Sequence, residues 1–245
     1  MRSDITLECR VDRDTNHTRA SLALDALRVI VRTRLRGQNG FDLSHDSAHC
    51  ERVERLANEL LEDDVLSEWV PLPGTVERDE FEFVVSAAAL LHDYNDHKYT
   101  GRFVEPSEEY RGSMIRNGIP ASLVDRVEII CDNVSWSKEC AAGPSEMEKV
   151  LATHPELRYV QDADRLDALG PIGVIRAASY SGRTLADFPA LMDVLKNRTM
   201  QLCGKMKTVS GVRRSHVLTV WTDQFVRALD SQIEGLDSPN FSKLT

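Results

Sequence analysis

The sequence predicts an all-α protein that folds as a single helical bundle. Apolar residues recur at the helical spacing of three and four along most of the chain. Turn residues such as Pro71-Leu72-Pro73-Gly74 and Gly143-Pro144 separate these segments. The length of 245 residues is enough to bury the core of one domain. We expect that domain over residues 21–236, after an N-terminal extension (1–20) and before a flexible tail (237–245).

The expected helices begin with segment 21–36, in which Leu24, Leu27 and Val31 lie near one face. A second helix opens at an aspartate over 46–66, and a long apolar segment forms a third over 78–92, although its FEFVV start alone is also typical of a strand. Further helices are expected at 107–117, 121–131, 156–168, 171–179, 187–206 and 211–234. The segments 67–77 and 133–146 are expected to be loops.

Charge and composition exclude several functions. The formal net charge is −9, whereas proteins that wrap duplex nucleic acid carry a basic face. No apolar stretch reaches the roughly 18–20 residues that a membrane-spanning helix needs, and the polar N-terminus lacks the apolar centre of a signal peptide. We therefore expect an intracellular, cytoplasmic protein without duplex nucleic acid or membrane partners. Whether it forms a homo-oligomer is left open.

The five cysteines are scattered, odd in number and form no CxxC pair, so a disulfide framework is not indicated. They are Cys9, Cys50, Cys131, Cys140 and Cys203.

Histidine and aspartate are concentrated in three short segments: SHDSAH (44–49), LLHDYNDHK (90–98) and VQDADRLDALG (160–170). The second closes an apolar helix with adjacent His92 and Asp93, and burial of such groups without partners costs free energy. A divalent metal resolves this, because imidazole and carboxylate are natural ligands for Zn, Mn, Fe, Co or Ni. His49 and an aspartate of the third segment complete the set, which contains no cysteine and so is unlike a structural zinc site.

These motifs, in the order His … His-Asp … Asp, resemble the HD superfamily of all-helical, metal-dependent phosphohydrolases. Within it, SHDSAHCERV, LLHDYNDHK and VQDADRLDALGPIGVIRA look like the small bacterial and fungal subgroup, some members of which are nucleotide pyrophosphohydrolases. The C-terminal MKT also looks like the ending of that subgroup. The resemblance covers residues 20–230.

The resemblance implies that His49, His92, Asp93 and Asp164 bind one divalent ion (Mn, Ni, Co, Mg, Zn or Fe). On a helix, Asp162 points about 200° away from Asp164, so both cannot ligate one ion without distortion. We expect Asp164 to be the ligand, and Asp162 and Asp167 to orient the histidines.

Other polar residues near these motifs are expected to act in catalysis or substrate binding. His45 is a phosphate contact, a general acid or a ligand, whereas Asp46 fits the helix N-cap equally well. Asp96 is expected to orient the nucleophile and Lys98 to contact phosphate. For Arg165, a phosphate contact and an internal ion pair stay open.

The resemblance implies hydrolysis of a phosphoester or phosphoanhydride, and a divalent ion supports this by lowering the pKa of a bound water toward about 7. The first substrate to consider is a nucleoside triphosphate, cleaved to monophosphate and pyrophosphate. Nothing matches GxxxxGK[ST], so phosphate binding depends on metal and side chains. Trp136, Tyr94 and Tyr99 either stack on a base or pack internally.

Two alternatives stay open. A di-iron oxygenase related to myo-inositol oxygenase needs two more histidines between the His-Asp pair and the last aspartate, and His97 and His154 lie in that interval. The other alternative is a nucleotide-binding module without catalysis.

Overall fold

The structure is a computed structural model that describes residues 2–36, 46–94, 107–184 and 188–236. All regular secondary structure in these ranges is helical, which confirms the predicted fold class. The helices are, in order, α1 (Arg2–Arg36), α2 (Ser47–Asp63), α3 (Val76–Leu91), α5 (Ser107–Arg116), α6 (Ala121–Asn133), α7 (Trp136–Ala142), α8 (Pro144–Thr153), α9 (Leu157–Asp167), α10 (Gly170–Thr184), α11 (Phe188–Asp193), the π-helix η1 (Val194–Arg198), the 3-10 helix η2 (Thr199–Lys205) and α12 (Val209–Leu236).

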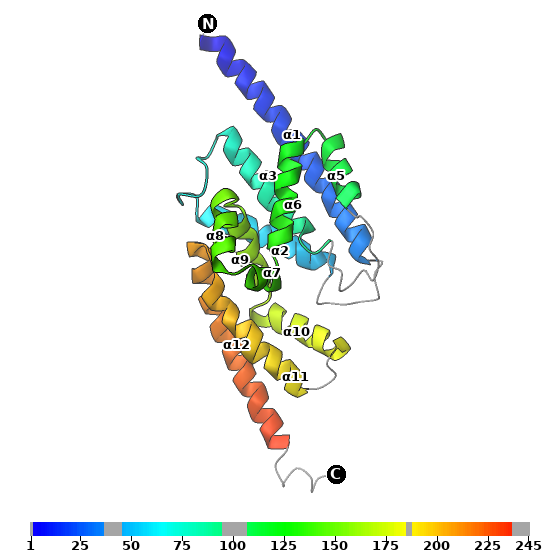
Figure 1. Ribbon diagram of the computed structural model, residues 1–245, viewed down its shortest axis with the longest axis vertical. Coiled ribbons are helices and arrows are strands. Elements are labelled where there is room, and N and C mark those ends of the chain that lie inside the picture. The colour runs from blue at the N-terminus through cyan, green and yellow to red at the C-terminus, as the bar shows by residue number, and fades with distance from the viewer. Residues whose placement is uncertain (1, 37–45, 95–106, 185–187, 237–245) are drawn as a thin grey trace.

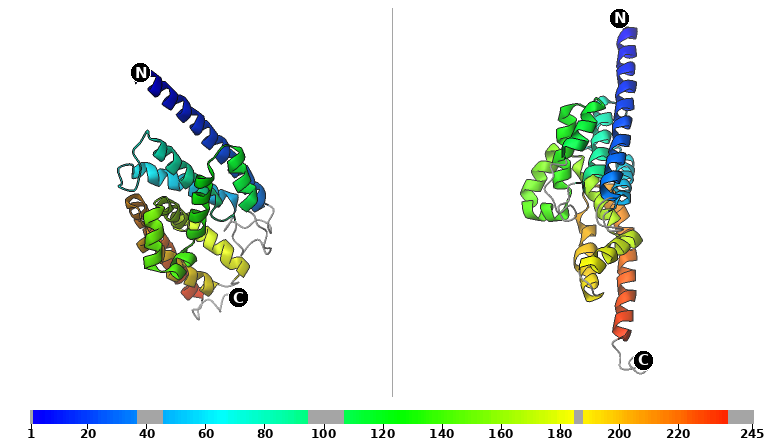
Figure 2. Two further views of the ribbon diagram at one scale, coloured as in Figure 1. Left: turned by 45° about the horizontal axis from the view of Figure 1, so that its top comes forward. Right: turned by 90° about the vertical axis from the view of Figure 1, so that its right-hand side faces the viewer.

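The first and last long helices extend from opposite ends of the molecule (Figures 1 and 2). Helix α1 runs from Arg2 to Arg36, so residues 2–20 of the expected extension form one continuous helix with the first expected helix. Near its C-terminal end, α1 is tied to α2 by ion pairs from Arg28 to Glu54 and from Arg32 to Glu51. None of the described helices is both long enough and apolar enough to cross a bilayer.

The main hydrophobic core surrounds α3. Every residue of α3 from Phe83 to Leu91 is buried, and α3 packs against α1, α2, α6 and α9. A smaller cluster joins α10, α11, η1 and α12 through Val174, Leu191, Leu195 and Val226. Because apolar side chains surround α3 on all sides, its C-terminal end lies in the interior of the bundle, where polar groups need partners.

Two expected boundaries are wrong. The segment 133–146, expected as a loop, contains α7 and the start of α8, because Gly143 (φ 79°) ends one helix and Pro144 occupies the first turn of the next. Proline is well accommodated there, since its missing N–H would have no helical partner. The segment 187–206, expected as one helix, is divided among α11, the π-helix η1 and the 3-10 helix η2.

The start of α12 is fixed by a buried carboxylate on α9. Asp162 is fully buried and accepts hydrogen bonds from the backbone N–H of Lys207 (2.9 Å) and of Thr208 (2.8 Å), and from Thr208 Oγ1 (2.8 Å). Burial raises the pKa of the Asp162 carboxyl, while these hydrogen bonds act in the opposite direction. The Thr208 hydroxyl in turn accepts from Gly211 N–H at 2.9 Å. This set of contacts joins α9 to α12.

Replacement of Asp162 by alanine should lower the free energy of unfolding by about 2 kcal/mol, because buried donors lose their acceptor. The measurement is urea denaturation followed by circular dichroism. Asp132→Ala is the control, since that side chain is 79% exposed and pairs only with Lys138 in the described structure. Equal effects of the two substitutions would contradict the anchoring role.

Candidate metal centre

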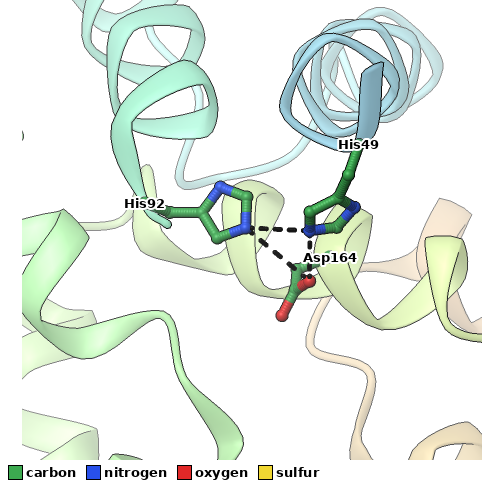
Figure 3. A group of neighbouring side chains, drawn as sticks. All are labelled: His49, His92 and Asp164. Carbon is green, nitrogen blue, oxygen red and sulfur yellow. Dashed lines mark hydrogen bonds and ion pairs between the residues drawn. The ribbon is translucent and has the colours of Figure 1, made fainter. Parts of the chain in front are cut away.

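Three helices bring the predicted ligands together. His49 lies in the first turn of α2, behind the N-cap Asp46, whose side chain accepts from His49 N–H at 2.9 Å. His92 directly follows α3, and Asp164 lies on α9. Figure 3 shows the three side chains converging from these elements, and their ligand atoms lie within 4.8 Å of one another.

The distances between these atoms suit one small cation. His49 Nε2 lies 3.2 Å from His92 Nε2 and 3.5 Å from Asp164 Oδ1, and His92 Nε2 lies 3.8 Å from the same oxygen. Asp93 adds a carboxylate, 3.4 Å from His49 Nε2 and 3.6 Å from His92 Nε2. Ligands about 2.1 Å from a common ion lie roughly 3.0–3.4 Å apart, so small adjustments would bring all four into contact with it.

Hydrogen bonds at the far side of each ring determine which nitrogen faces this centre. His49 Nδ1 lies 2.7 Å from Asp167 Oδ2, and His92 Nδ1 lies 2.8 Å from the Ala89 carbonyl oxygen. Both acceptors require a proton on Nδ1, so the neutral rings present lone pairs at their Nε2 atoms. With both rings neutral, two lone pairs 3.2 Å apart repel each other unless a proton or a metal cation lies between them. The donor set therefore fits a divalent metal ion.

The carboxylates make the centre favourable for positive charge. Burial and the Arg176 charge would lower the pKa of His49, but hydrogen bonds to Asp164, Asp167 and Asp93 outweigh them and raise it to about 10. Burial would raise the pKa of Asp164, yet the hydrogen bond to His49 and the histidine charges hold it below its ordinary value. A metal ion would meet the same demand for positive charge.

Asp167 has the position expected of a residue that orients a ligand. Besides His49, its carboxylate accepts from Arg52 Nε (2.7 Å), Arg52 Nη2 (3.0 Å) and Arg176 Nη1 (3.0 Å). Burial opposes its ionisation, but His49 and Arg52 hold the pKa of Asp167 far below its usual range. The sequence analysis missed both arginines. Arg52 lies three residues after His49 and so on the same side of α2, which was an available signal; Arg176 offered none.

Other expected site residues lie elsewhere or outside the described structure. Asp162 contacts Lys207 and Thr208 and orients no histidine, because its side chain points away from Asp164 on α9. Arg165 is 2% exposed, donates to the Lys205 carbonyl and pairs with Glu139, so its contacts correspond to the internal ion pair. His154, one of two histidines that a di-iron site needs, does not belong to the group of converging ligands. The residues outside the described ranges are His45, Asp96, His97, Lys98 and Tyr99.

The comparisons with known proteins agree with this geometry. The model of the HD domain family matches residues 47–169, which include all four converging side chains. The protein YpgQ of Bacillus subtilis (strain 168) is 27% identical over 200 residues, which are 79% of this chain and 87% of YpgQ.

Solved structures show the same fold. The crystal structure of Bacillus subtilis YpgQ in complex with ADP has a TM-score of 0.64 at 24% identity and covers 90% of this chain and 100% of its own. The Lin1889 protein of Listeria innocua has a TM-score of 0.63 at 19% identity, with coverage of 88% and 97%.

Asp167→Asn should weaken metal binding about 10- to 100-fold, because the amide cannot hold the His49 ring as the carboxylate does. Titration of chelator-treated protein with Mn²⁺ measures the effect. Asp63→Asn is a matched control, since Asp63 also pairs with two arginines, Arg213 and Arg214, but contacts no histidine in the described structure. Unchanged affinity in Asp167→Asn would refute the orienting role.

Proposed function

The chain belongs to the HD domain family, and from this membership and the ligand geometry we propose that it is a divalent-metal-dependent phosphohydrolase. The observation that carries the proposal is the facing pair of His49 and His92 Nε2 atoms, 3.2 Å apart, with Asp93 and Asp164 beside them. Such an arrangement is costly without a cation and suits a divalent ion.

Each residue of the centre has a distinct proposed role. His49, His92 and Asp164 hold the ion together with the adjacent Asp93, and Asp167 keeps the His49 ring in the tautomer that directs Nε2 inward. Arg52 and Arg176 bind Asp167 and keep it ionised. A divalent ion supplies two functions in phosphoryl chemistry, activation of a water nucleophile and neutralisation of charge on phosphoryl oxygens. His45, Asp96 and Lys98 remain our proposals for substrate contact and for orienting the nucleophile.

We propose a nucleotide as the substrate, with cleavage of a nucleoside triphosphate to monophosphate and pyrophosphate as the first reaction to test. The crystal structure of YpgQ in complex with ADP supports a nucleotide, because that protein shares the fold over 90% of this chain. An HD-superfamily hydrolase of Bacillus thuringiensis, with a TM-score of 0.50 at 23% identity, supports hydrolysis as the reaction class.

His92→Ala and Asp93→Ala should each abolish turnover and reduce metal content to background, because each removes an ion ligand. Activity is measured as release of pyrophosphate or phosphate, and bound metal by elemental analysis. His216→Ala, at an exposed position on α12, should leave both unchanged. Full activity in either ligand variant would remove the basis of the proposal.

Chelator treatment should abolish hydrolysis, and addition of Mn²⁺, Mg²⁺, Co²⁺ or Ni²⁺ should restore it with ion-dependent efficiency, since sites of histidine and carboxylate accept several divalent ions. A panel of nucleoside triphosphates and other phosphorylated metabolites measures the substrate range. Hydrolysis that persists unchanged in chelator-treated protein would contradict metal dependence. Hydrolysis confined to phosphorylated sugars would keep the metal centre but overturn the nucleotide assignment.

A further inference from the structure

A cavity of about 620 Å³ lies among α7, α8, α9 and the segment that leads into α12. Its volume falls within the range of about 300–1,000 Å³ that is common for small-molecule sites. Two indole side chains line it, Trp69 from the segment between α2 and α3 and Trp136 from the start of α7. The chain contains only three tryptophans, so two of them meet at this cavity.

This cavity lies on the opposite side of α9 from the metal centre. Successive residues of an α-helix are rotated by about 100°, so Arg158, Asp162 and Arg165 form one stripe of α9, whereas Asp164 and Asp167 face roughly the other way. Arg158 lines the cavity, and Asp164 and Asp167 contact His49. A ligand of this cavity would therefore not occupy the metal site.

The charges that line the cavity include two cations available to an anion. Glu139 accepts from Lys207 and pairs with Arg165, so the acid is fully engaged by internal partners. Arg158 lies over the Trp69 ring at 4.4 Å and Lys205 near the Trp136 ring at 5.4 Å. In the described part of the chain neither pairs with a carboxylate, although Arg158 Nη1 also donates to the Leu151 carbonyl oxygen, which leaves its other N–H groups for an anion. The other acid of the lining is Glu148.

Each indole thus has at least one cation beside it, with Arg165 as a second one at 5.4 Å from the Trp136 ring. An aromatic ring next to a cation corresponds to the two parts of a nucleotide. Aromatic side chains bind bases through their π-faces, and lysine and arginine bind phosphate oxygens. We propose that the cavity is a second nucleotide site, in which the base packs against Trp69 or Trp136 and the phosphates contact Lys205 and Arg158. This site is independent of hydrolysis at the metal centre.

The test is the binding of ADP to chelator-treated protein, measured by tryptophan fluorescence and by equilibrium dialysis. ADP should bind saturably and change the fluorescence. Adenosine, which has the base without phosphates, and inorganic pyrophosphate, which has phosphates without the base, should each bind at least about tenfold more weakly. Absence of saturable ADP binding would overturn the proposal. Pyrophosphate binding as tightly as ADP would overturn the role of the indoles and with it the nucleotide assignment.

Variants locate the bound ADP. Lys205→Glu, at an exposed position, should weaken ADP binding about tenfold or more through charge reversal, and Lys138→Glu, exposed on α7 but outside the cavity lining, should not. His92→Ala should bind ADP as the unaltered protein does. Loss of ADP binding in His92→Ala, or equal binding in Lys205→Glu and Lys138→Glu, would overturn the proposal.

Discussion

The proposed metal centre depends on two hydrogen bonds at the outer nitrogens of its histidines. Asp167 and the Ala89 carbonyl hold the Nδ1 positions, and this directs both Nε2 atoms to one point. Without these acceptors each ring would be free to change tautomer or to rotate, and the convergence of α2, α3 and α9 would not by itself produce a pair of inward lone pairs. In the proposed site, the preference for a cation therefore depends on contacts that would not touch the ion.

Helix α9 is the element on which the other parts of the site converge. It carries Asp164 and Asp167 toward the histidines, Asp162 toward α12 and Arg165 toward Glu139 of α7. Each of these polar side chains has a partner from another part of the chain, which offsets the free-energy cost of burying charge on a short helix. The same contacts limit how far the helix can rotate, and they keep the faces of the metal centre and of the cavity apart.

The sequence predicted the all-α fold and the three segments that meet, because apolar periodicity and a His-Asp pair at the end of an apolar helix are local signals. The angular argument on a helix also separated Asp164 from Asp162, and Asp164 lies beside the histidines. The arginine partners of Asp167 were not predicted: Arg52 had the local signal of its spacing from His49, which was not used, whereas no sequence signal linked Arg176, on another helix, to Asp167. Glu139 was missed because a Gly-Pro pair concealed the helix before it.

The contact of Gly211 with α9 has a consequence for variation in this chain. A Cβ atom at position 211 would lie 2.4 Å from Asp162 Oδ2 and 2.7 Å from Thr208 Oγ1. Any larger residue must displace that carboxylate, and Asp162 is two positions from Asp164, the proposed ion ligand. Position 211 is thus constrained by steric crowding and not by backbone conformation. A substitution in α12 would shift α9 and with it the geometry of the proposed metal centre, to which α12 contributes no side chain.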